Sequence, residues 1–212
     1  MSEKELQLLQ WPPLVVETRQ RSAALRKLLG GAAPSGDTAR EHLSAAGGGL
    51  RELRWAAWIV LSRVLTVIGP DRQGHKLLIP FIDMFNHRAT CKHYLTGRTD
   101  GNLKVVAGEK IRAGEQVHIV YGTDATSNVE LLGHYGFVDA AGAASADRAV
   151  VRANPDAVAA LRFTSLEDDT ALLEADPERP YKERLALSLR VVLKKAAIKE
   201  GLLDAKGAPP SA

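Results

Sequence analysis

Two polar pairs in the middle of this chain stand at the ends of apolar segments and could do chemistry. Asn86-His87 follows residues 79–85, and Tyr121-Gly122 follows residues 117–120. An amide, an imidazole and a phenol at strand ends can face a ligand, and glycine lets the ligand approach the backbone closely. Taken alone, an Asn-His pair is more often a turn with satisfied hydrogen bonds. A strand-end tyrosine alone is more often a core residue whose hydroxyl is paired.

The order of motifs around these pairs is more specific than either pair. The chain has Trp55, Trp58 and Arg63 on an expected helix, then Asn86-His87, Tyr121-Gly122, Ser-Asn-Val-Glu-Leu-Leu at 127–132 and Tyr-Gly-Phe-Val at 135–138. This order resembles the C-terminal half of the SET domain. The likeness is to the branch that includes the Rubisco large-subunit lysine methyltransferase and the actin-histidine methyltransferase. It is close over residues 52–139 and looser over residues 5–30 and the C-terminal helices.

The resemblance implies a protein methyltransferase that uses S-adenosylmethionine as methyl donor. Arg63, Asn86 and His87 would bind the donor, with Arg63 near its carboxylate, which a guanidinium fork fits with two hydrogen bonds. Tyr121 would be the catalytic residue and a donor contact, with its hydroxyl directed at the transferred methyl group. The alternative for Arg63 is a helix arginine that extends its charged end into water.

The same resemblance places three further residues along the channel through which the acceptor nitrogen would enter. These are Ile82, Tyr135 and Phe137. For the two aromatic residues, packing at a helix end is the alternative. The actin-histidine enzyme has a tryptophan where Ile82 stands, so this residue favours lysine over histidine as the acceptor, in a protein other than a histone.

Methyl transfer from a sulfonium needs few chemical groups. It is an in-line displacement, so the main contribution of the protein is to position the acceptor nitrogen, the methyl carbon and the sulfur. Tyrosine and carbonyl oxygens can orient the methyl group by CH···O contacts. An apolar aromatic channel lowers the pKa of a lysine by desolvation and so favours the neutral amine. The reaction requires neither a metal nor a covalent enzyme intermediate.

One half of the family's domain has no counterpart in this sequence. The only Gly-x-Gly motif is Gly47-Gly48-Gly49, which lies between two expected helices rather than beside a strand. We therefore expect a pocket without one wall, and a chain that is weakly active or inactive alone. The chain could be a fragment of a full enzyme or a natural truncation. A second hypothesis is a non-catalytic, SET-derived module that binds another protein.

Hydrophobic periodicity and the turn residues predict an α+β fold. Helices are expected over residues 3–30 with a break at Trp11-Pro12-Pro13, over Thr38–Ala46, over Leu50–Val67 and within 153–203. Strands are expected over Lys76–Phe81, Asn102–Ala107 and Gln116–Val120. The remaining segments are a loop over 30–38, a linker over 140–146 and a frayed tail from 204. The β-rich part would be the C-terminal half of a SET fold between two helical regions.

The same pattern divides the chain into three parts. Residues 1–68 would correspond to the helical insertion of the SET domain, and residues 69–140 to its C-terminal core. Residues 141–212 would begin a helical region that helps to bind a protein substrate. The sequence does not indicate an oligomeric state.

Composition excludes several other classes of protein. A net charge of +3 with dispersed Lys and Arg does not favour a nucleic-acid partner. The single cysteine, Cys91, excludes an internal disulfide and, with His87 and His93 beside it, gives too few ligands for a typical zinc site. The charged N-terminus and the interrupted apolar run from Trp55 to Ile68 predict a soluble intracellular protein without a membrane span. Cytoplasm, nucleus and plastid are not distinguished.

Overall fold

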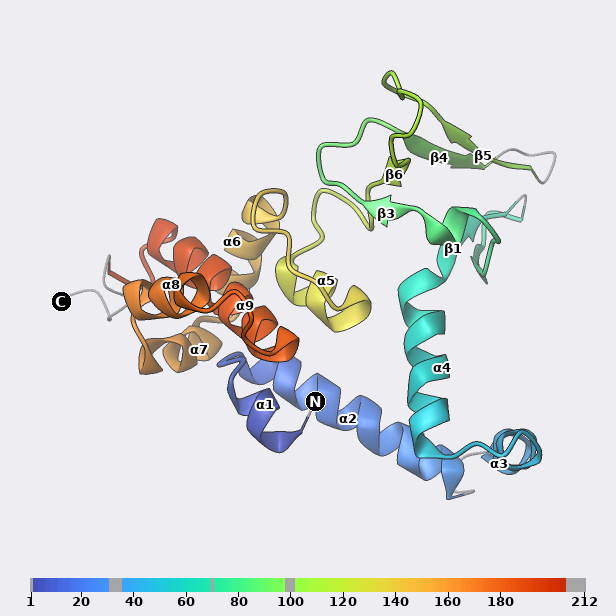
Figure 1. The fold of residues 1–212 in the computed structure, drawn as a ribbon, viewed down its shortest axis with the longest axis horizontal. Coiled ribbons are helices and arrows are strands. Elements are labelled where there is room, and N and C mark those ends of the chain that lie inside the picture. Colours follow the sequence, from blue (N-terminus) through green and yellow to red (C-terminus); the bar gives the residue numbers. More distant parts are fainter. Residues whose placement is uncertain (1, 31–35, 70, 98–101, 205–212) are drawn as a thin grey trace. The chain divides into compact units, whose positions relative to one another are not determined.

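The computed structural model of the protein describes residues 2–30, 36–69, 71–97 and 102–204. Its chain divides into two compact units, Met1–Arg54 with Asp124–Ala212, and Trp55–Thr123. Helices build the first unit, and the described strands all lie in the second (Figure 1). With 54% helix and 11% strand, the structure confirms the α+β class. The division into residues 1–68, 69–140 and 141–212 concerns family likeness and stays a prediction.

The first unit contains most of the helices. They are α1 (Glu3–Gln7), α2 (Pro12–Leu29), α3 (Gly36–Ala45), the start of α4 (Leu50–Arg63), α5 (Asn128–Tyr135), α6 (Ala144–Ala153), α7 (Pro155–Val158), the 3-10 helix η2 (Ala159–Phe163), α8 (Leu166–Ala175) and α9 (Tyr181–Lys199). The break expected at Trp11-Pro12-Pro13 is confirmed, because Pro12 opens α2 at a position that needs no backbone N–H. The break at Gly47-Gly48-Gly49 is confirmed as well.

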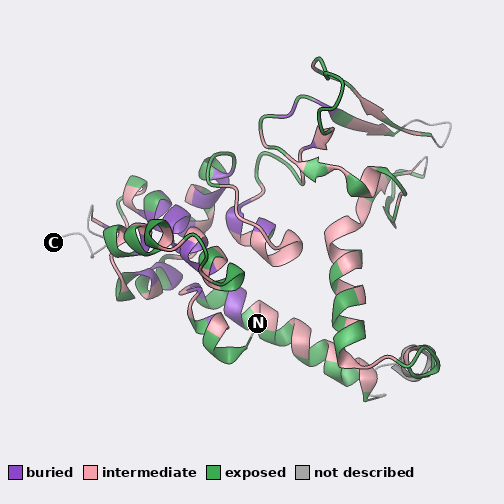
Figure 2. Ribbon diagram, viewed as in Figure 1, coloured by how far each residue is buried: buried purple, intermediate pink, exposed green. Residues whose placement is uncertain are grey.

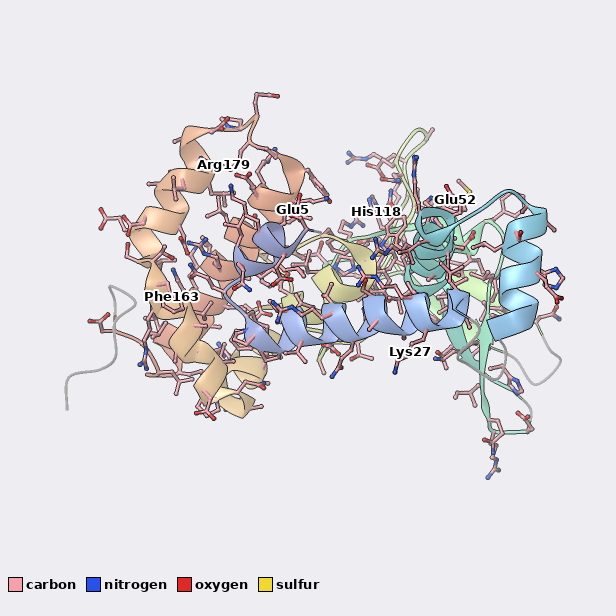
Figure 3. All side chains as sticks on the ribbon, turned by 90° about the horizontal axis from the view of Figure 1, so that it is seen from below. Glu5, Lys27, Glu52, His118, Phe163 and Arg179 are labelled. Atoms are coloured by element: carbon pink, nitrogen blue, oxygen red, sulfur yellow. The ribbon has the colours of Figure 1, made fainter. Side chains whose placement is uncertain are left out.

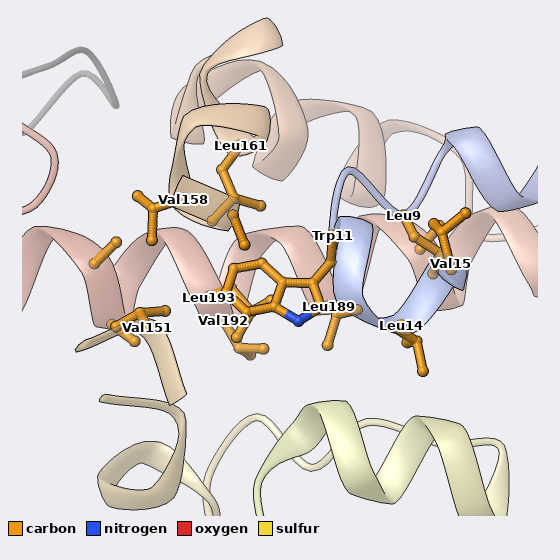
Figure 4. Packing of buried hydrophobic residues seen from close by; sticks show 14 of the residues in the cluster. Leu9, Trp11, Leu14, Val15, Val151, Val158, Leu161, Leu189, Val192 and Leu193 are labelled. Carbon is orange, nitrogen blue, oxygen red and sulfur yellow. The ribbon is translucent and has the colours of Figure 1, made fainter. Parts of the chain in front are cut away.

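Helix α9 is the central element of the first unit, and buried residues concentrate along it (Figure 2). Trp11, which is 1% exposed, packs into the same hydrophobic cluster as Leu161, Leu189 and Leu193. Figure 4 shows its indole ring between the η2 turn and α9. The residue that separates α1 from α2 is therefore also the largest apolar side chain of this core.

A buried ionic cluster ties α8 to α9 within this unit. The carboxylate of Asp169 accepts hydrogen bonds from Arg190 Nε at 2.9 Å and from Lys194 Nζ at 2.5 Å. Lys194 also donates to the carbonyl oxygen of Thr164 at 2.6 Å and to that of Ser165 at 3.1 Å. Desolvation lowers the pKa of Lys194, and the hydrogen bond to Asp169 opposes this shift. Each buried charge in the cluster has a partner, so the cluster has a structural role and holds α8 against α9.

Three two-stranded sheets make up the strand content of the second unit, as far as the structure describes it. β1 (Leu65–Ile68) pairs antiparallel with β2 (Gly74–Leu77), and β4 (Tyr94–Gly97) pairs antiparallel with β5 (Leu103–Val106). The third pair is parallel and joins β3 (Asn86–His87) to β6 (His118–Ile119). This shortest ladder carries the Asn-His pair and leads directly to Tyr121.

Several predicted boundaries are wrong, for reasons of residue type or of strand pairing. The helix expected over Leu50–Val67 ends at Arg63, because the β-branched residues that follow form β1. The strand expected over Lys76–Phe81 is instead Gly74–Leu77, whose register is set by pairing with β1. The linker expected over 140–146 contains the start of α6, where Ala146 is buried. Alanine suits a helix as well as a flexible segment.

Other elements match the expectation in part. The strand over Asn102–Ala107 is confirmed as β5, whereas Gln116–Val120 shortens to the two residues of β6. Most of the expected loop over 30–38 and of the frayed tail from 204 lies outside the described residues. Among the described helices, none has the length and apolar character needed to cross a membrane.

The buried ionic cluster gives a stability prediction. Replacing Asp169 by alanine leaves two buried cations without a counter-charge, so we expect the free energy of unfolding to fall by about 3–5 kcal/mol. Urea denaturation followed by circular dichroism would measure the change. Glu167→Ala removes an exposed carboxylate from the same helix and should cost less than about 1 kcal/mol. Similar losses for the two variants would contradict the structural role of Asp169.

Candidate functional site

Tyr121 is held at both of its ends inside the second unit. Its backbone N–H donates to Nδ1 of His87 at 3.0 Å, and its hydroxyl donates to the carbonyl oxygen of Phe85 at 2.6 Å. The rings of His87 and Tyr121 also contact each other, with centroids 5.5 Å apart. A phenol fixed in this way points in one direction. The orienting role of Tyr121 in methyl transfer stays a prediction.

A single short turn receives hydrogen bonds from two of the predicted site residues. The 3-10 helix η1 (Ile82–Met84) begins after Phe81, whose φ of 72° is unusual for a residue other than glycine. The guanidinium of Arg63 donates to the carbonyl oxygen of Asp83. Because Tyr121 donates to the carbonyl of Phe85, only two residues further, the structure brings Arg63 and Tyr121 to the same turn. Ile82 lies in this turn and is half-buried.

Arg63 keeps capacity for an anionic ligand. The side chain is half-buried at the end of α4, and the bond to Asp83 uses one of the five N–H donors of its guanidinium group. A guanidinium that is fixed to a backbone carbonyl is also better positioned than one that extends freely into water. The contact with the carboxylate of a methyl donor stays a prediction.

The register of the β3–β6 ladder separates the side chains of the Asn-His pair. Asn86 stands opposite His118, and His87 stands opposite Ile119. Because neighbouring side chains along a strand point to opposite faces, Asn86 and His118 share one face, and His87 shares the other with Ile119. The His87 ring therefore serves to position Tyr121. Donor contacts by Asn86 and His87 stay predictions.

The two aromatic residues expected in the acceptor channel belong to the first unit. Tyr135 ends α5, and its ring lies 6.2 Å from that of Phe137. Between them, Gly136 ends the helix in a left-handed conformation with φ of 80°. Burial, and secondarily the charge of Glu130, raises the pKa of Tyr135. The channel that these residues would form with Ile82 stays a prediction.

The motif at 127–130 has a structural role. Ser127 and Glu130 form a capping box at the start of α5. Asn128 is 1% exposed and donates its backbone and side-chain N–H groups to the two carboxylate oxygens of Asp147, at 2.7 Å each. Its amide oxygen accepts from the backbone N–H of Asp139 at 2.6 Å. Asp147 lies beside the segment expected to be a linker, so no pattern marked it as a partner.

Cys91, His93 and Glu109 form the one described group whose ligand atoms lie close enough to hold a metal, within 4.8 Å of one another. Their hydrogen bonds do not suit one. Nδ1 of His93 accepts from the backbone N–H of Gly108 at 3.2 Å, so the ring proton of a neutral imidazole sits on Nε2. Metal-binding histidines instead donate from the nitrogen that does not bind the metal. The Cys91 thiol donates to the carbonyl oxygen of His118 at 3.1 Å.

Comparisons with known proteins give a similarity over part of the chain. No family model matches. The chain is 38% identical over 92 residues to the actin-histidine N-methyltransferase of Drosophila melanogaster, which covers 41% of this chain and 17% of that protein. It is 38% identical over 91 residues to the enzymes of that name from Homo sapiens and Dasypus novemcinctus, 14% of each.

These matches support a relationship with a protein methyltransferase family. The chain spans less than a fifth of the length of these curated relatives, with matches of 17% and 14%. The substrate of these relatives can therefore be assigned to this chain only as a proposal.

Asp147 gives a prediction about stability and pH. Burial raises the pKa of its carboxyl group, the hydrogen bonds from Asn128 partly oppose the shift, and the charge of Asp139 adds to it. The folded state thus favours the protonated carboxyl. Its contribution to stability is complete below the unfolded pKa of about 3.9 and is lost as the pH rises through the raised folded value.

An asparagine at position 147 cannot ionise and escapes this loss. We expect the free energy of unfolding of Asp147→Asn, relative to the unchanged protein, to shift in favour of the variant between about pH 4 and pH 7. Urea denaturation across that range would measure it, with Asp156→Asn as an exposed carboxylate control. A difference that stays constant with pH would contradict the prediction.

Proposed function

We propose that this chain carries the donor-binding and methyl-orienting part of an S-adenosylmethionine-dependent protein N-methyltransferase. The observation that carries the proposal is the fixation of Tyr121 by Phe85 and His87, on the turn that also binds Arg63. The partial similarity to actin-histidine N-methyltransferases supports the class of reaction.

Each residue of this arrangement has a task in the proposed reaction. Arg63 would hold the carboxylate of the donor with the N–H groups that Asp83 does not use. Asn86 would add a polar contact from the exposed face of the β3–β6 ladder. The Tyr121 hydroxyl, which donates to the carbonyl of Phe85, would orient the electron-poor methyl group by CH···O contacts. His87 keeps the Tyr121 backbone in place.

The acceptor nitrogen is proposed to belong to a lysine of a protein other than a histone. Ile82, which stands where the actin-histidine enzyme has a tryptophan, favours this choice. Histidine is a second candidate, because the relatives are named for it. Transfer of a tritiated methyl group to acceptor proteins, followed by mass spectrometry of the labelled residue, would distinguish the two nitrogens.

Donor binding is the first test, because it does not require the acceptor to be known. We expect calorimetric titration of S-adenosylmethionine into the purified chain to give micromolar affinity that Asn86→Ala weakens at least about tenfold. Lys104→Ala, which removes an exposed cation from β5, should leave the affinity unchanged. Absence of binding to a folded chain would contradict the proposal and leave the protein-interaction module as the remaining hypothesis.

Tyr121→Phe separates chemistry from binding. The variant keeps the ring but loses the oxygen that orients the methyl group, so in a version that carries both halves of the SET domain we expect methyl transfer to fall by about 100-fold or more. Donor affinity should change by less than about threefold, because the oxygen acts on the methyl group in the transition state. Thermal denaturation would check that the lost bond to Phe85 has not unfolded the unit. Equal losses of transfer and affinity would rule out the orienting role.

A further inference from the structure

His118 carries a buried polar atom without a partner. Its ring nitrogen Nδ1 is shielded from solvent, and no described residue forms a hydrogen bond with it. One other described side-chain atom has this property, Nε of Arg179, but that guanidinium already pairs with Glu183 through Nη1 at 3.4 Å. Buried polar atoms are nearly always paired, because an unpaired one lowers stability. The imidazole of His118 therefore needs an explanation.

The backbone places this imidazole beside a residue of the proposed donor site. His118 is the ladder partner of Asn86 in the parallel β3–β6 pair, so the two side chains stand next to each other on one face. Asn86 is exposed and His118 is half-buried, with its Nδ1 atom shielded from solvent (Figure 3, where His118 is labelled). The carbonyl of His118 is held by the Cys91 thiol at 3.1 Å, so its position is fixed.

We propose that His118 and Asn86 form a polar subsite that binds an N–H group of the methyl donor. The inference rests on the proposed function and extends it to a residue to which the sequence analysis gave no role. With the ring proton on Nε2, Nδ1 accepts a hydrogen bond, and the Asn86 amide oxygen accepts a second. S-adenosylmethionine has N–H donors at two places, the adenine amine and the amino-acid ammonium. Its carboxylate, an acceptor, falls to Arg63.

His118 would lower the stability of the folded protein and raise its affinity for the methyl donor. Without a ligand, the unpaired Nδ1 makes the folded state less stable, and with a ligand it gains a partner. Replacement by an apolar residue should therefore move the two properties in opposite directions. A purely structural histidine would not show that pattern.

The test compares His118→Leu with His118→Asn in the full chain. We expect His118→Leu to keep or raise the melting temperature while it weakens S-adenosylmethionine binding about tenfold in calorimetry. His118→Asn keeps a polar atom near the position of Nδ1 and should recover most of the affinity. Titration with 5′-methylthioadenosine, which lacks the amino-acid end, identifies the group. A penalty that persists assigns the adenine amine, and one that disappears assigns the ammonium.

Three results would overturn the subsite. Unchanged affinity in His118→Leu, with the loss in Asn86→Ala intact, would remove His118 from the site and leave the proposed function standing. A lower melting temperature and an equal loss of affinity in both His118 variants would indicate a packing defect instead. No donor binding by the unchanged protein would overturn the subsite and the proposed function together.

Discussion

The arrangement of the candidate site in the second unit depends on the two hydrogen bonds that hold Tyr121. A parallel ladder of two residues, Asn86 and His87 against His118 and Ile119, supplies few backbone hydrogen bonds. Side chain-to-backbone bonds compensate, from Tyr121 to Phe85, from the Tyr121 backbone to His87, and from Arg63 to Asp83. The residues with predicted chemical roles are thus also the residues that stabilise the local backbone. A substitution among them affects structure and chemistry together, and matched variants are needed to separate the two.

The first unit follows a different physical plan. Its core depends on apolar burial along α9, with Trp11 as the largest contributor, and on polar groups that are paired inside it. The Asp169 cluster joins α8 to α9, and the Asn128–Asp147 pair joins α5 to α6, so each connects two helices that are consecutive in the chain. Buried polar pairs add little net stability compared with apolar packing, but they exclude alternative arrangements in which a charge or an amide would be left unpaired.

The sequence predicted features that depend on local chemistry. Pro12 at the start of α2, the three glycines before α4 and the alternation in β5 followed from residue type alone. The family pattern selected Arg63 and Tyr121, which the structure brings to one turn. Features that depend on distant partners were missed. Leu65, Thr66 and Val67 fit a helix or a strand, and pairing with β2 decides between them. Asp147 and His118 have no marked sequence pattern, because their importance comes from burial and ladder register.

The reactivity of the buried Cys91 thiol can be used to measure local opening of the second unit. It is the only cysteine in the sequence, it lies in the second unit, and it is 8% exposed with its thiol bonded to the carbonyl of His118. A thiol-reactive dye can label it only when the segment around His118 opens, so the labelling rate measures the free energy of that opening. A ligand that binds only the closed segment must slow the labelling in proportion to its occupancy. The natural sequence thus allows ligand occupancy to be followed without an engineered label.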